Sequence, residues 1–367
     1  MQVNDNVRMK HFGNFIALLI LAINALFTGL LLLVAYSPYI QPVAHPVQSC
    51  FGLTFPIFAL INGAFLIFWL VIQRYKTALL PLIGFLLCYS QLRTYLPLNF
   101  HTANPPEESI KFLSYNIMGF NGAGKKDGKN PILTYLKESN ADILCLQEYA
   151  SDESPRRLTQ KDIERELKDY PYHRISVVGS GSGYTNKIAC YSKFPILSAR
   201  VLNYPSGYNG SVLYELKLNE DTITLINNHL ESNKLTKADK DIYEDILKAP
   251  EKEKVKSGAR LLVHKLAEAS AIRAPQADTS RYPSVIVCGD FNDTPISYAH
   301  RVIAKNLDDA FTQSGRGLGI SYNQNKFYFR IDNILISKNL QSYNCTVDRS
   351  IKESDHYPIW CYIAKRQ

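Results

Sequence analysis

The sequence predicts an α/β protein with a mixed β-sheet, preceded by two or three transmembrane helices. The first hundred of its 367 residues contain long uncharged stretches. After position 108, short apolar segments alternate with polar helical ones, and polar side chains recur where the apolar segments end. Strands mixed with helices over a segment of this length are typical of layered α/β folds.

Three apolar segments occupy the N-terminal region. Phe12–Gln41 contains no charged residue, and a helix through Gly13–Tyr36 would be ~36 Å long, enough to cross a bilayer. Phe51–Ile72 is a second uncharged segment. The third, Thr77–Leu92, has 16 residues and contains Pro81, whereas a spanning helix usually needs ~17–25. We therefore expect a transmembrane region at 1–96, with helices near 13–36, 51–72 and 77–93.

The basic residues of this region predict its orientation. Arg8 and Lys10 precede the first segment, the connection Ser37–Ser49 has no Lys or Arg, and Arg74 and Lys76 follow the second segment. By the positive-inside rule, the N-terminus and the Arg74 connection are cytoplasmic. We expect the third segment to span a thinned bilayer, which puts the C-terminal domain outside the cytoplasm. If the third segment is re-entrant, that domain is cytoplasmic.

A proline-containing linker at 97–108 separates this region from a domain at 109–367. Periodicity and turn residues predict its elements. The predicted strands are Ile110–Tyr115, Asp142–Gln147, Ile175–Val178, Ile188–Ser192, Val212–Leu218, Thr222–Asn227, Ser284–Cys288, Ile331–Ser337 and Ile359–Ile363. The predicted helices are Pro131–Glu138, Gln160–Asp169 and Glu253–Ile272.

Charge and cysteine content limit the possible functions. The net charge is +8, and 36 basic and 32 acidic residues lie beyond position 100. This mild excess suits an anionic substrate and lacks the dense basic footprint of a tight duplex-DNA binder. The seven cysteines show no CxxC pair and no zinc spacing. Cys145, Cys190 and Cys288 lie in apolar segments and are predicted to be core thiols.

Polar residues mark six predicted strand ends, and Asp and Asn in turns explain only some of them. They are Asn116, Gln147-Glu148, Asn228-His229, Asp290 with Asn292 and Asp293, Asp332-Asn333, and Asp355-His356. Hydrolysis of a phosphate ester would use residues of these types. A cation must neutralise charge on the phosphate in the transition state, and carboxylates and amides can hold that cation.

The residues suggest individual roles. Magnesium needs one or two carboxylates and keeps several waters, so Glu148 suits a metal ligand and Asn116 can hold a metal-bound water. Asp290 is the candidate that orients or deprotonates the attacking water. Asn292, two residues on in an extended segment, can steady the phosphate or the water.

Two histidines compete for one role in this scheme. Either His356 or His229 would contact the phosphoryl oxygens or protonate the leaving group. Asp355 or Asp332 would orient the histidine and hold it protonated.

Six short motifs resemble, in order, those of the endonuclease/exonuclease/phosphatase superfamily, which has the DNase I-like fold. They are S-Y-N (114–116), L-Q-E (146–148), N-H-L (228–230), G-D-F-N (289–292), R-I-D (330–332) and S-D-H (354–356). The resemblance runs from Ser109 to the C-terminus. It implies a four-layer α/β sandwich of two mixed β-sheets packed face to face.

The same resemblance implies a site. It assigns metal binding to Glu148 and Asn116, with Mg²⁺ as the cofactor and Mn²⁺ as a substitute. It assigns catalytic roles to Asp290, Asn292, His229, His356, Asp332 and Asp355.

Two further residues are expected to contact substrate. Several nucleases of the family carry an acidic or tyrosyl residue on the strand before the S-[RK]-[FY]-P-[IL] element, here residues 192–196, and this chain has Asn186 instead. An amide cannot supply the charge of a carboxylate, which puts the transfer of any one subfamily's mechanism in doubt. Arg330 would contact a phosphate, or alternatively hold the strand of Asp332 through a salt bridge.

The expected protein is a membrane-anchored, divalent-metal-dependent phosphoesterase acting on phosphodiester or phosphomonoester bonds. Its substrate would be nucleic acid, a phospholipid or a phospholipid headgroup. The lipid bilayer would be its other partner, and no obligate protein partner is inferred. The alternative is a catalytically inactive, membrane-bound binding protein on the same fold. All six motifs are intact, which favours the enzyme.

Overall fold

A computed structural model describes most of the chain. The described residues are 2–121, 129–151, 158–181, 184–202, 206–232, 284–322, 324 and 328–366, the side chains of 2–10, 181 and 184 excepted. The helix predicted at 253–272 lies outside the described residues.

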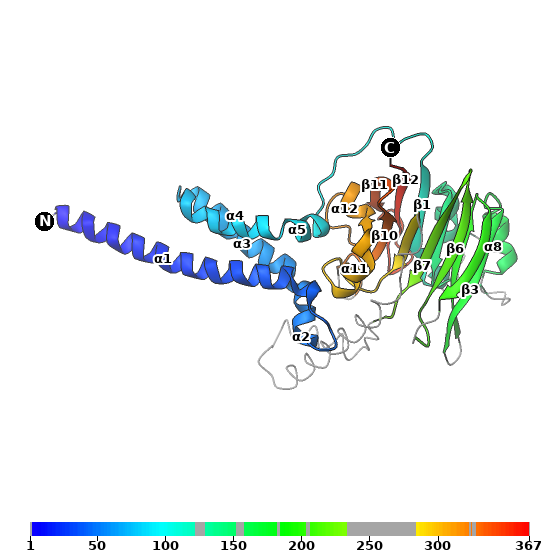
Figure 1. Cartoon of the computed structure of the whole chain (residues 1–367), viewed down its shortest axis with the longest axis horizontal. Helices are drawn as coiled ribbons and strands as arrows, with labels where there is room; N and C mark the ends of the chain where they lie inside the picture. Colours follow the sequence, from blue (N-terminus) through cyan, green and yellow to red (C-terminus); the bar gives the residue numbers. More distant parts are fainter. Residues whose placement is uncertain are drawn as a thin grey trace.

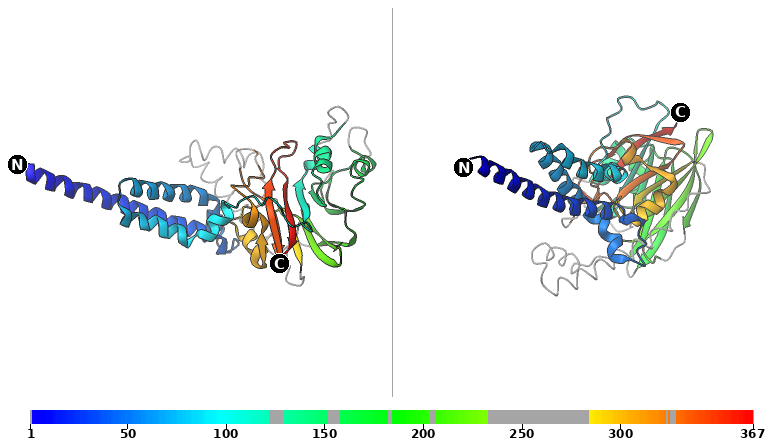
Figure 2. Two further views of the ribbon diagram at one scale, coloured as in Figure 1. Left: turned by 90° about the horizontal axis from the view of Figure 1, so that it is seen from above. Right: turned by 60° about the vertical axis from the view of Figure 1, so that its left-hand side comes forward.

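The N-terminal helices lie side by side and project from the rest of the molecule (Figures 1 and 2). The N-terminus is at the end far from the β-sheets, and α5 leads back toward them (Figure 1). The elements are α1 (Gln2–Ala35), η1 (Ser37–Tyr39), α2 (Pro46–Ser49), η2 (Cys50–Thr54), α3 (Phe55–Val71), α4 (Tyr75–Leu87) and α5 (Tyr89–Tyr95).

Polar side chains buried between α1 and α3 bond to one another. The Thr28 hydroxyl donates to Asn62 Oδ1 at 2.8 Å, and Trp69 Nε1 donates to Asn24 Oδ1 at 3.0 Å. Such pairs add specificity to helix contacts where the surroundings are otherwise apolar.

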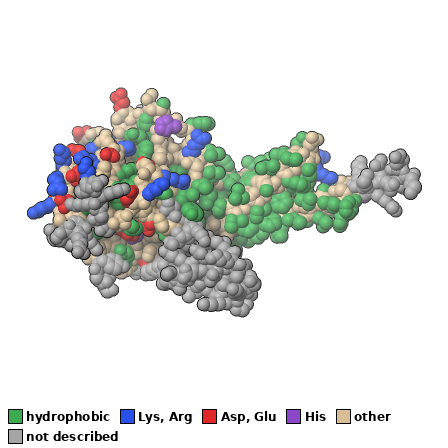
Figure 3. Space-filling view, turned by 180° about the vertical axis from the view of Figure 1, so that it is seen from behind, with side chains coloured by type: hydrophobic (Ala, Val, Ile, Leu, Met, Phe, Trp, Pro, Cys, Tyr) green, Lys and Arg blue, Asp and Glu red, His purple; other side chains and the backbone are tan. Residues whose placement is uncertain are grey.

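Two of these helical segments are long and apolar enough to cross a membrane. His11–Tyr39 has a mean hydropathy of 2.6 and Pro46–Val71 one of 2.0, and only 22% and 17% of these windows are buried. A core helix of a water-soluble domain would be mostly buried, whereas here hydrophobic side chains cover the outside of the helices (Figure 3). The third segment is broken at Cys88, which separates α4 from α5.

The C-terminal part contains two six-stranded sheets. The first has the order β11-β12-β1-β2-β4-β3 and the second β5-β6-β7-β8-β10-β9. Strand β1 pairs with β2, and β7 with β8, in parallel, and the remaining pairings are antiparallel. The strands are β1 (Ile110–Asn116), β2 (Ile143–Gln147), β3 (Tyr172–Gly181), β4 (Tyr184–Ser192), β5 (Ile196–Leu202), β6 (Gly210–Leu218), β7 (Asp221–His229), β8 (Val285–Asp290), β9 (Leu307–Asp309), β10 (Asp332–Ser337), β11 (Leu340–Val347) and β12 (Ile359–Lys365).

Helices cover the outer faces of both sheets, and α12 packs into the core between them. The described helices of this part are α6 (Met118–Asn121), α7 (Pro131–Glu138), α8 (Gln160–Glu166), α11 (Tyr298–Ile303), η4 (Ala304–Asn306) and α12 (Ala310–Ser314). A core between the sheets joins Phe112 of the first sheet to Ile286 of the second. Residues of α7 and α8 pack on the outside of the first sheet, and Ile303 of α11 packs on the outside of the second. The predicted four-layer sandwich is confirmed, and the three cysteines expected in the core are buried and free.

Three strands were not predicted from the sequence. In β5, only Ile196 is buried, so the strand lacks the alternation that marks a half-buried strand. Strand β9 has only three residues, and β11 is interrupted between Tyr343 and Thr346. The predicted helix at 160–169 ends earlier, at Glu166.

The helical region and the sandwich are packed together. Ile296, in the connection after β8, is buried in a cluster with Val34 and Phe55. Gly52 leaves room for this contact, because a Cβ there would lie 2.1 Å from the Ile296 carbonyl oxygen. The segment expected to be a linker also makes contacts, with Asn99 Nδ2 donating to the Gly315 carbonyl at 2.8 Å.

Candidate active site

Strand direction brings the predicted polar residues to one edge of the sandwich. Both parallel pairs end there, and the antiparallel strands β4 and β10 begin there. The register puts His229 and Asp332 opposite Asp290 on its two neighbouring strands. A site assembled from six strands therefore follows from the topology.

Asp290 lies at the centre of this site and is 1% exposed. Its Oδ1 accepts the backbone N–H of Asn292 at 2.8 Å. Its Oδ2 lies 3.2 Å from Asn116 Nδ2, 3.5 Å from His356 Nε2 and 3.7 Å from His229 Nε2. Burial raises the pKa of Asp290 although both histidines oppose the shift, and a higher pKa makes the carboxylate a better base.

Two residues with positive φ, Gly289 and Asn292, flank Asp290. Gly289 has φ 118°, and a Cβ there would lie 2.0 Å from the Asn228 carbonyl oxygen, so only glycine fits. Asn292 has φ 52°, and its Nδ2 donates to the Leu230 carbonyl at 3.0 Å. The described contacts of Asn292 thus support the conformation of the chain around Asp290.

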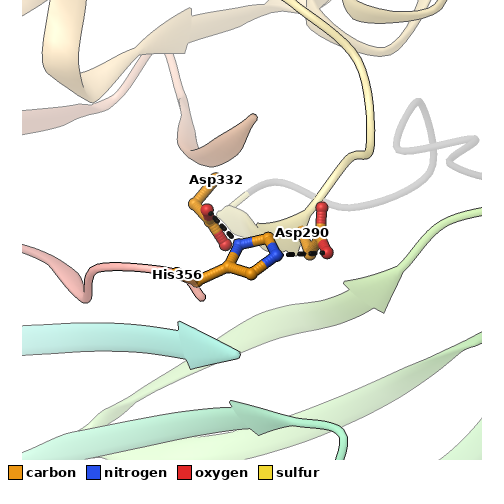
Figure 4. A group of neighbouring side chains, drawn as sticks. All are labelled: Asp290, Asp332 and His356. Carbon is orange, nitrogen blue, oxygen red and sulfur yellow. Dashed lines mark hydrogen bonds and ion pairs between the residues drawn. The ribbon is translucent and has the colours of Figure 1, made fainter. Parts of the chain in front are cut away.

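His356 is held between two carboxylates (Figure 4). Its Nδ1 lies 2.8 Å from Asp332 Oδ2 and its Nε2 3.5 Å from Asp290 Oδ2. Burial alone would lower the pKa of His356, but the charges of Asp332 and Asp290 outweigh it and raise the pKa to about 10. His356 is therefore an imidazolium at neutral pH, with Nδ1–H donating to Asp332.

His229 has a different environment. Its Nδ1 lies 3.0 Å from Asn186 Nδ2, which also donates to the Tyr208 carbonyl at 3.0 Å. With the amide donating, Nδ1 is the acceptor and Nε2 carries the proton. Burial lowers the pKa of His229, opposed mainly by Asp290. One site thus holds a cationic histidine and a neutral one.

Glu148 and Asp290 converge on the same amide. Asn116 Nδ2 lies 3.2 Å from Glu148 Oε1 and 3.2 Å from Asp290 Oδ2. Burial raises the pKa of the Glu148 carboxyl, partly offset by the hydrogen bond from Asn116. Glu148 has φ 51°, a conformation that costs a non-glycine residue about 1–3 kcal/mol and is characteristic of functional sites.

This arrangement fits a hard divalent cation. The buried Asp290 and the partly exposed Glu148 carboxylates face one amide and repel each other, and a bound cation would relieve the repulsion. The Glu148 side chain is 32% exposed, so the position is accessible. Asp290, Asp332 and His356 also lie close enough together to hold a metal ion. The imidazolium already neutralises those carboxylates, so the Glu148 side of the site suits a cation better.

Arg330 does not reach this site. Its guanidinium donates to Asp309 Oδ2 at 2.7 Å, to Asn333 Oδ1 at 3.0 Å and to the Thr94 carbonyl at 3.2 Å. With its side chain 1% exposed, Arg330 cannot meet a substrate. The expected substrate contact is therefore wrong, and the alternative of a salt bridge that holds the strand of Asp332 is the one observed.

The alternatives for the acidic partner of the histidine are also distinguished. Asp332 bonds to His356, whereas the described hydrogen bond of Asp355 is to the Ser354 hydroxyl, at 3.4 Å. The charge of Asp355 contributes to the raised pKa of His356 after those of Asp332 and Asp290.

Several supporting residues were missed in the sequence. The Ser354 hydroxyl donates to the Asn116 carbonyl at 2.7 Å and accepts the His356 N–H at 3.2 Å. The Ser321 hydroxyl accepts the Asp332 N–H at 3.0 Å. Ser354 belongs to the S-D-H motif, which could have suggested a role, whereas Ser321 has no local signal.

Comparison with known proteins identifies the family. The profile described as the Endonuclease/Exonuclease/phosphatase family matches residues 113–356, so the chain belongs to this family. Its enzymes hydrolyse phosphoester bonds, and they generally use divalent metals. A profile described as Domain of unknown function (DUF8431) matches residues 17–95. No functionally curated protein matches the chain.

The chain is similar to several solved structures, and the first of them supports the fold. An endonuclease/exonuclease/phosphatase from Beutenbergia cavernae DSM 12333 is 14% identical, with a TM-score of 0.51 and coverage of 70% of this chain and 72% of that one. A family member from Bacteroides vulgatus is 16% identical, with a TM-score of 0.46 and coverage of 70% and 99%. A humanized D. rerio TDP2 is 16% identical, with a TM-score of 0.44 and coverage of 71% and 100%.

Proposed function

We propose that the chain is a membrane-anchored, Mg²⁺-dependent phosphoesterase whose site is centred on Asp290. The proposal rests on one observation: Asn116, His229 and His356 all lie next to the same oxygen, Asp290 Oδ2. The other oxygen is fixed by a backbone N–H. One oriented carboxylate oxygen next to two imidazoles is what an in-line attack of water on phosphorus needs.

Each side chain of the site has a separate role in the proposed hydrolysis. Asp290 Oδ2 accepts a proton from the attacking water, and its raised pKa favours this transfer. The cationic His356 stabilises negative charge on the phosphoryl oxygens, with Asp332 fixing its orientation. His229, neutral with a proton on Nε2, donates a hydrogen bond to the same phosphate. In this scheme the Asn186 amide replaces a carboxylate and keeps His229 uncharged.

Glu148 and Asn116 would hold the cation, with Mg²⁺ as the natural ion and Mn²⁺ as a substitute. The ion supplies charge neutralisation to the phosphoryl group and the leaving oxygen when bound. Asn116 contacts both carboxylates, so its amide links the cation position to the base.

The membrane anchor is the helical region of residues 1–96. If α1 and α3 span, the α4–α5 segment runs from Tyr75 to Tyr95, 21 residues, and returns the chain to the sandwich. Arg74 and Lys76 mark the cytoplasmic end, which gives an extracytoplasmic catalytic domain. The substrate is then a phosphoester outside the cytoplasm, either nucleic acid or a phospholipid headgroup.

The alternative is an inactive binding protein on the same fold. It would need one of the reacting groups to be missing or misplaced, whereas the base, both histidines and the two proposed cation-binding residues lie together at one edge of the sandwich.

The experiment is a substrate panel with the full-length chain in a neutral detergent, with Mg²⁺, Mn²⁺ or EDTA. The panel includes single- and double-stranded DNA, RNA, sphingomyelin, phosphoinositides and an aryl phosphodiester. Hydrolysis that requires the metal and is lost in Asp290→Asn supports the proposal. If no member is cleaved, or cleavage survives in Asp290→Asn, the site assignment is wrong.

A further inference from the structure

A cavity away from the candidate active site lies between the helical region and the sandwich. It has a volume of about 570 Å³, within the ~300–1,000 Å³ of ordinary ligand pockets. One wall comes from η1 and α5 of the helical region and the other from α11, η4 and the β9–α12 segment. No residue proposed above for catalysis or metal binding lines it.

The cavity has an excess of positive charge. Arg93, Arg301 and Lys305 line it, and within the described part of the chain neither Arg93 nor Lys305 forms an ion pair. Arg301 Nε donates to the Pro38 carbonyl at 2.8 Å, and its guanidinium lies over Tyr39, 4.7 Å from the ring centre. Its terminal nitrogens have no partner among the described residues.

The acidic side chains of the cavity are already paired. Asp308 Oδ1 lies 2.6 Å from Lys338 Nζ, and Asp308 Oδ2 lies 3.0 Å from Arg366. Asp309 Oδ2 lies 2.7 Å from Arg330. Asp309 also lies 3.5 Å from His300, which lines the cavity, whereas Lys338, Arg366 and Arg330 do not. Arg93, Arg301 and Lys305 therefore remain available to an anion. Guanidinium and ammonium groups together suit a phosphate, which accepts several hydrogen bonds.

The position of the cavity indicates that its phosphate belongs to a membrane lipid. It lies where the apolar helices meet the sandwich, and Tyr36, Tyr39 and Tyr89 are exposed at these helix ends. Tyrosines concentrate at membrane–water interfaces, with their rings at the level of the lipid headgroups. Leu86 and Leu87 are also exposed, 64% and 54%, on the adjoining end of α4. An acyl chain could therefore lie on the helices while its phosphate enters the cavity.

We propose that this cavity binds the headgroup of an anionic glycerophospholipid, with Arg93, Arg301 and Lys305 as the phosphate contacts. The inference rests on the membrane anchoring proposed above and not on the phosphoesterase activity. The bound lipid bridges α5 and α11, and so fixes the sandwich against the membrane surface next to the connection that follows Asp290.

The test is native mass spectrometry of the full-length chain in neutral detergent, in EDTA so that no metal-dependent hydrolysis occurs. Phosphatidylglycerol and phosphatidylcholine are titrated at equal concentration. Tighter binding of phosphatidylglycerol is expected, and the double variant Arg93→Gln/Lys305→Gln should weaken it by about 30-fold, as for loss of two interfacial cations. The control Arg174→Gln/Arg200→Gln removes two exposed charges from β3 and β5 and should leave binding unchanged.

Three results would overturn the proposal. They are equal binding of the two lipids, an equal effect of the two double variants, and displacement of phosphatidylglycerol by inorganic phosphate at similar concentration, which would indicate a free-phosphate site. Hydrolysis of an aryl phosphodiester with Mg²⁺ is measured on the same preparations and should not change in either double variant. Lipid binding without hydrolysis would refute the phosphoesterase proposal alone, and hydrolysis without selective lipid binding would refute this inference alone.

Discussion

Replacing Asp332 with asparagine removes the charge that keeps His356 protonated while preserving the shape of the side chain. The carboxylate lies 2.8 Å from His356 Nδ1, and its charge is the largest of those that raise the histidine's pKa. Without it, the pKa should fall from about 10 toward the ordinary value of 6.5. The protonated fraction at pH 8 would then fall from about 99% to about 3%, a loss of roughly 30-fold in the cationic form.

The assay is the rate of aryl phosphodiester hydrolysis between pH 6 and 9 at saturating Mg²⁺. Asp332→Asn should lose about 30-fold at pH 8 relative to the unaltered chain and recover most of it by pH 6.5, as the histidine is protonated again. A variant with unaltered rate and pH profile would show that the charge on His356 does not contribute to catalysis. A loss independent of pH would indicate that Asp332 only positions the ring.

The pair formed by His356 and Asp332 also predicts how the stability of the protein depends on pH. The folded-state pKa of His356 is raised above 6.5, so its contribution is fully present below about pH 6.5 and is lost as the pH rises through about 10. The free energy of unfolding of metal-free protein should therefore fall over this range, by urea denaturation, and Asp332→Asn should remove much of the slope. Equal slopes in the two proteins would contradict the raised pKa.

Three further predictions follow from the structure. Asp290→Asn and His356→Ala should each lower the rate of hydrolysis by ~10²–10⁴-fold. If both residues act on one transition state, the double variant should lose much less than the product of the two single losses. Fully multiplicative losses would argue that the two residues act independently. Arg330→Ala removes the guanidinium partner of the buried Asp309 carboxylate and should destabilise the protein by about 3–5 kcal/mol in denaturant unfolding. A change below ~1 kcal/mol would refute the role of the pair. A phosphatase active only outside the cytoplasm, fused after residue 367, should be active, and a fluorescent protein that folds only inside should stay dark; the reverse would put the catalytic domain in the cytoplasm.

Buried central strands were the part of the fold that the sequence predicted best. Strand β8 is an apolar segment buried throughout, and the sequence predicted it at Ser284–Cys288, two residues short of its observed end at Asp290. Strand β5 has exposed side chains at Ala199 and Arg200 and is held by pairing with β6, which the sequence does not encode locally. Edge strands are defined by their neighbours more than by their own pattern.

The candidate active site, like the fold, could be predicted only in part from the sequence. Asp290 and Glu148 could be proposed from residue type and position alone. The choice between Asp332 and Asp355 depends on the antiparallel register of β8 and β10, which sets Asp332 opposite Asp290. The sequence left Arg330 as either a substrate contact or a salt-bridge residue, because its partner, Asp309, is 21 residues away. Burial and partner choice of this kind arise only from tertiary packing.

The most direct test of metal-dependent catalysis at this site is the rate of Glu148→Gln as a function of Mg²⁺ concentration. An amide is a poor ligand for a hard cation, so the variant should lose ~10²-fold or more in rate, and its Mg²⁺ midpoint should move to higher concentration. A near-normal rate at saturating Mg²⁺ with an unchanged midpoint would remove Glu148 from the metal site and contradict the proposed function.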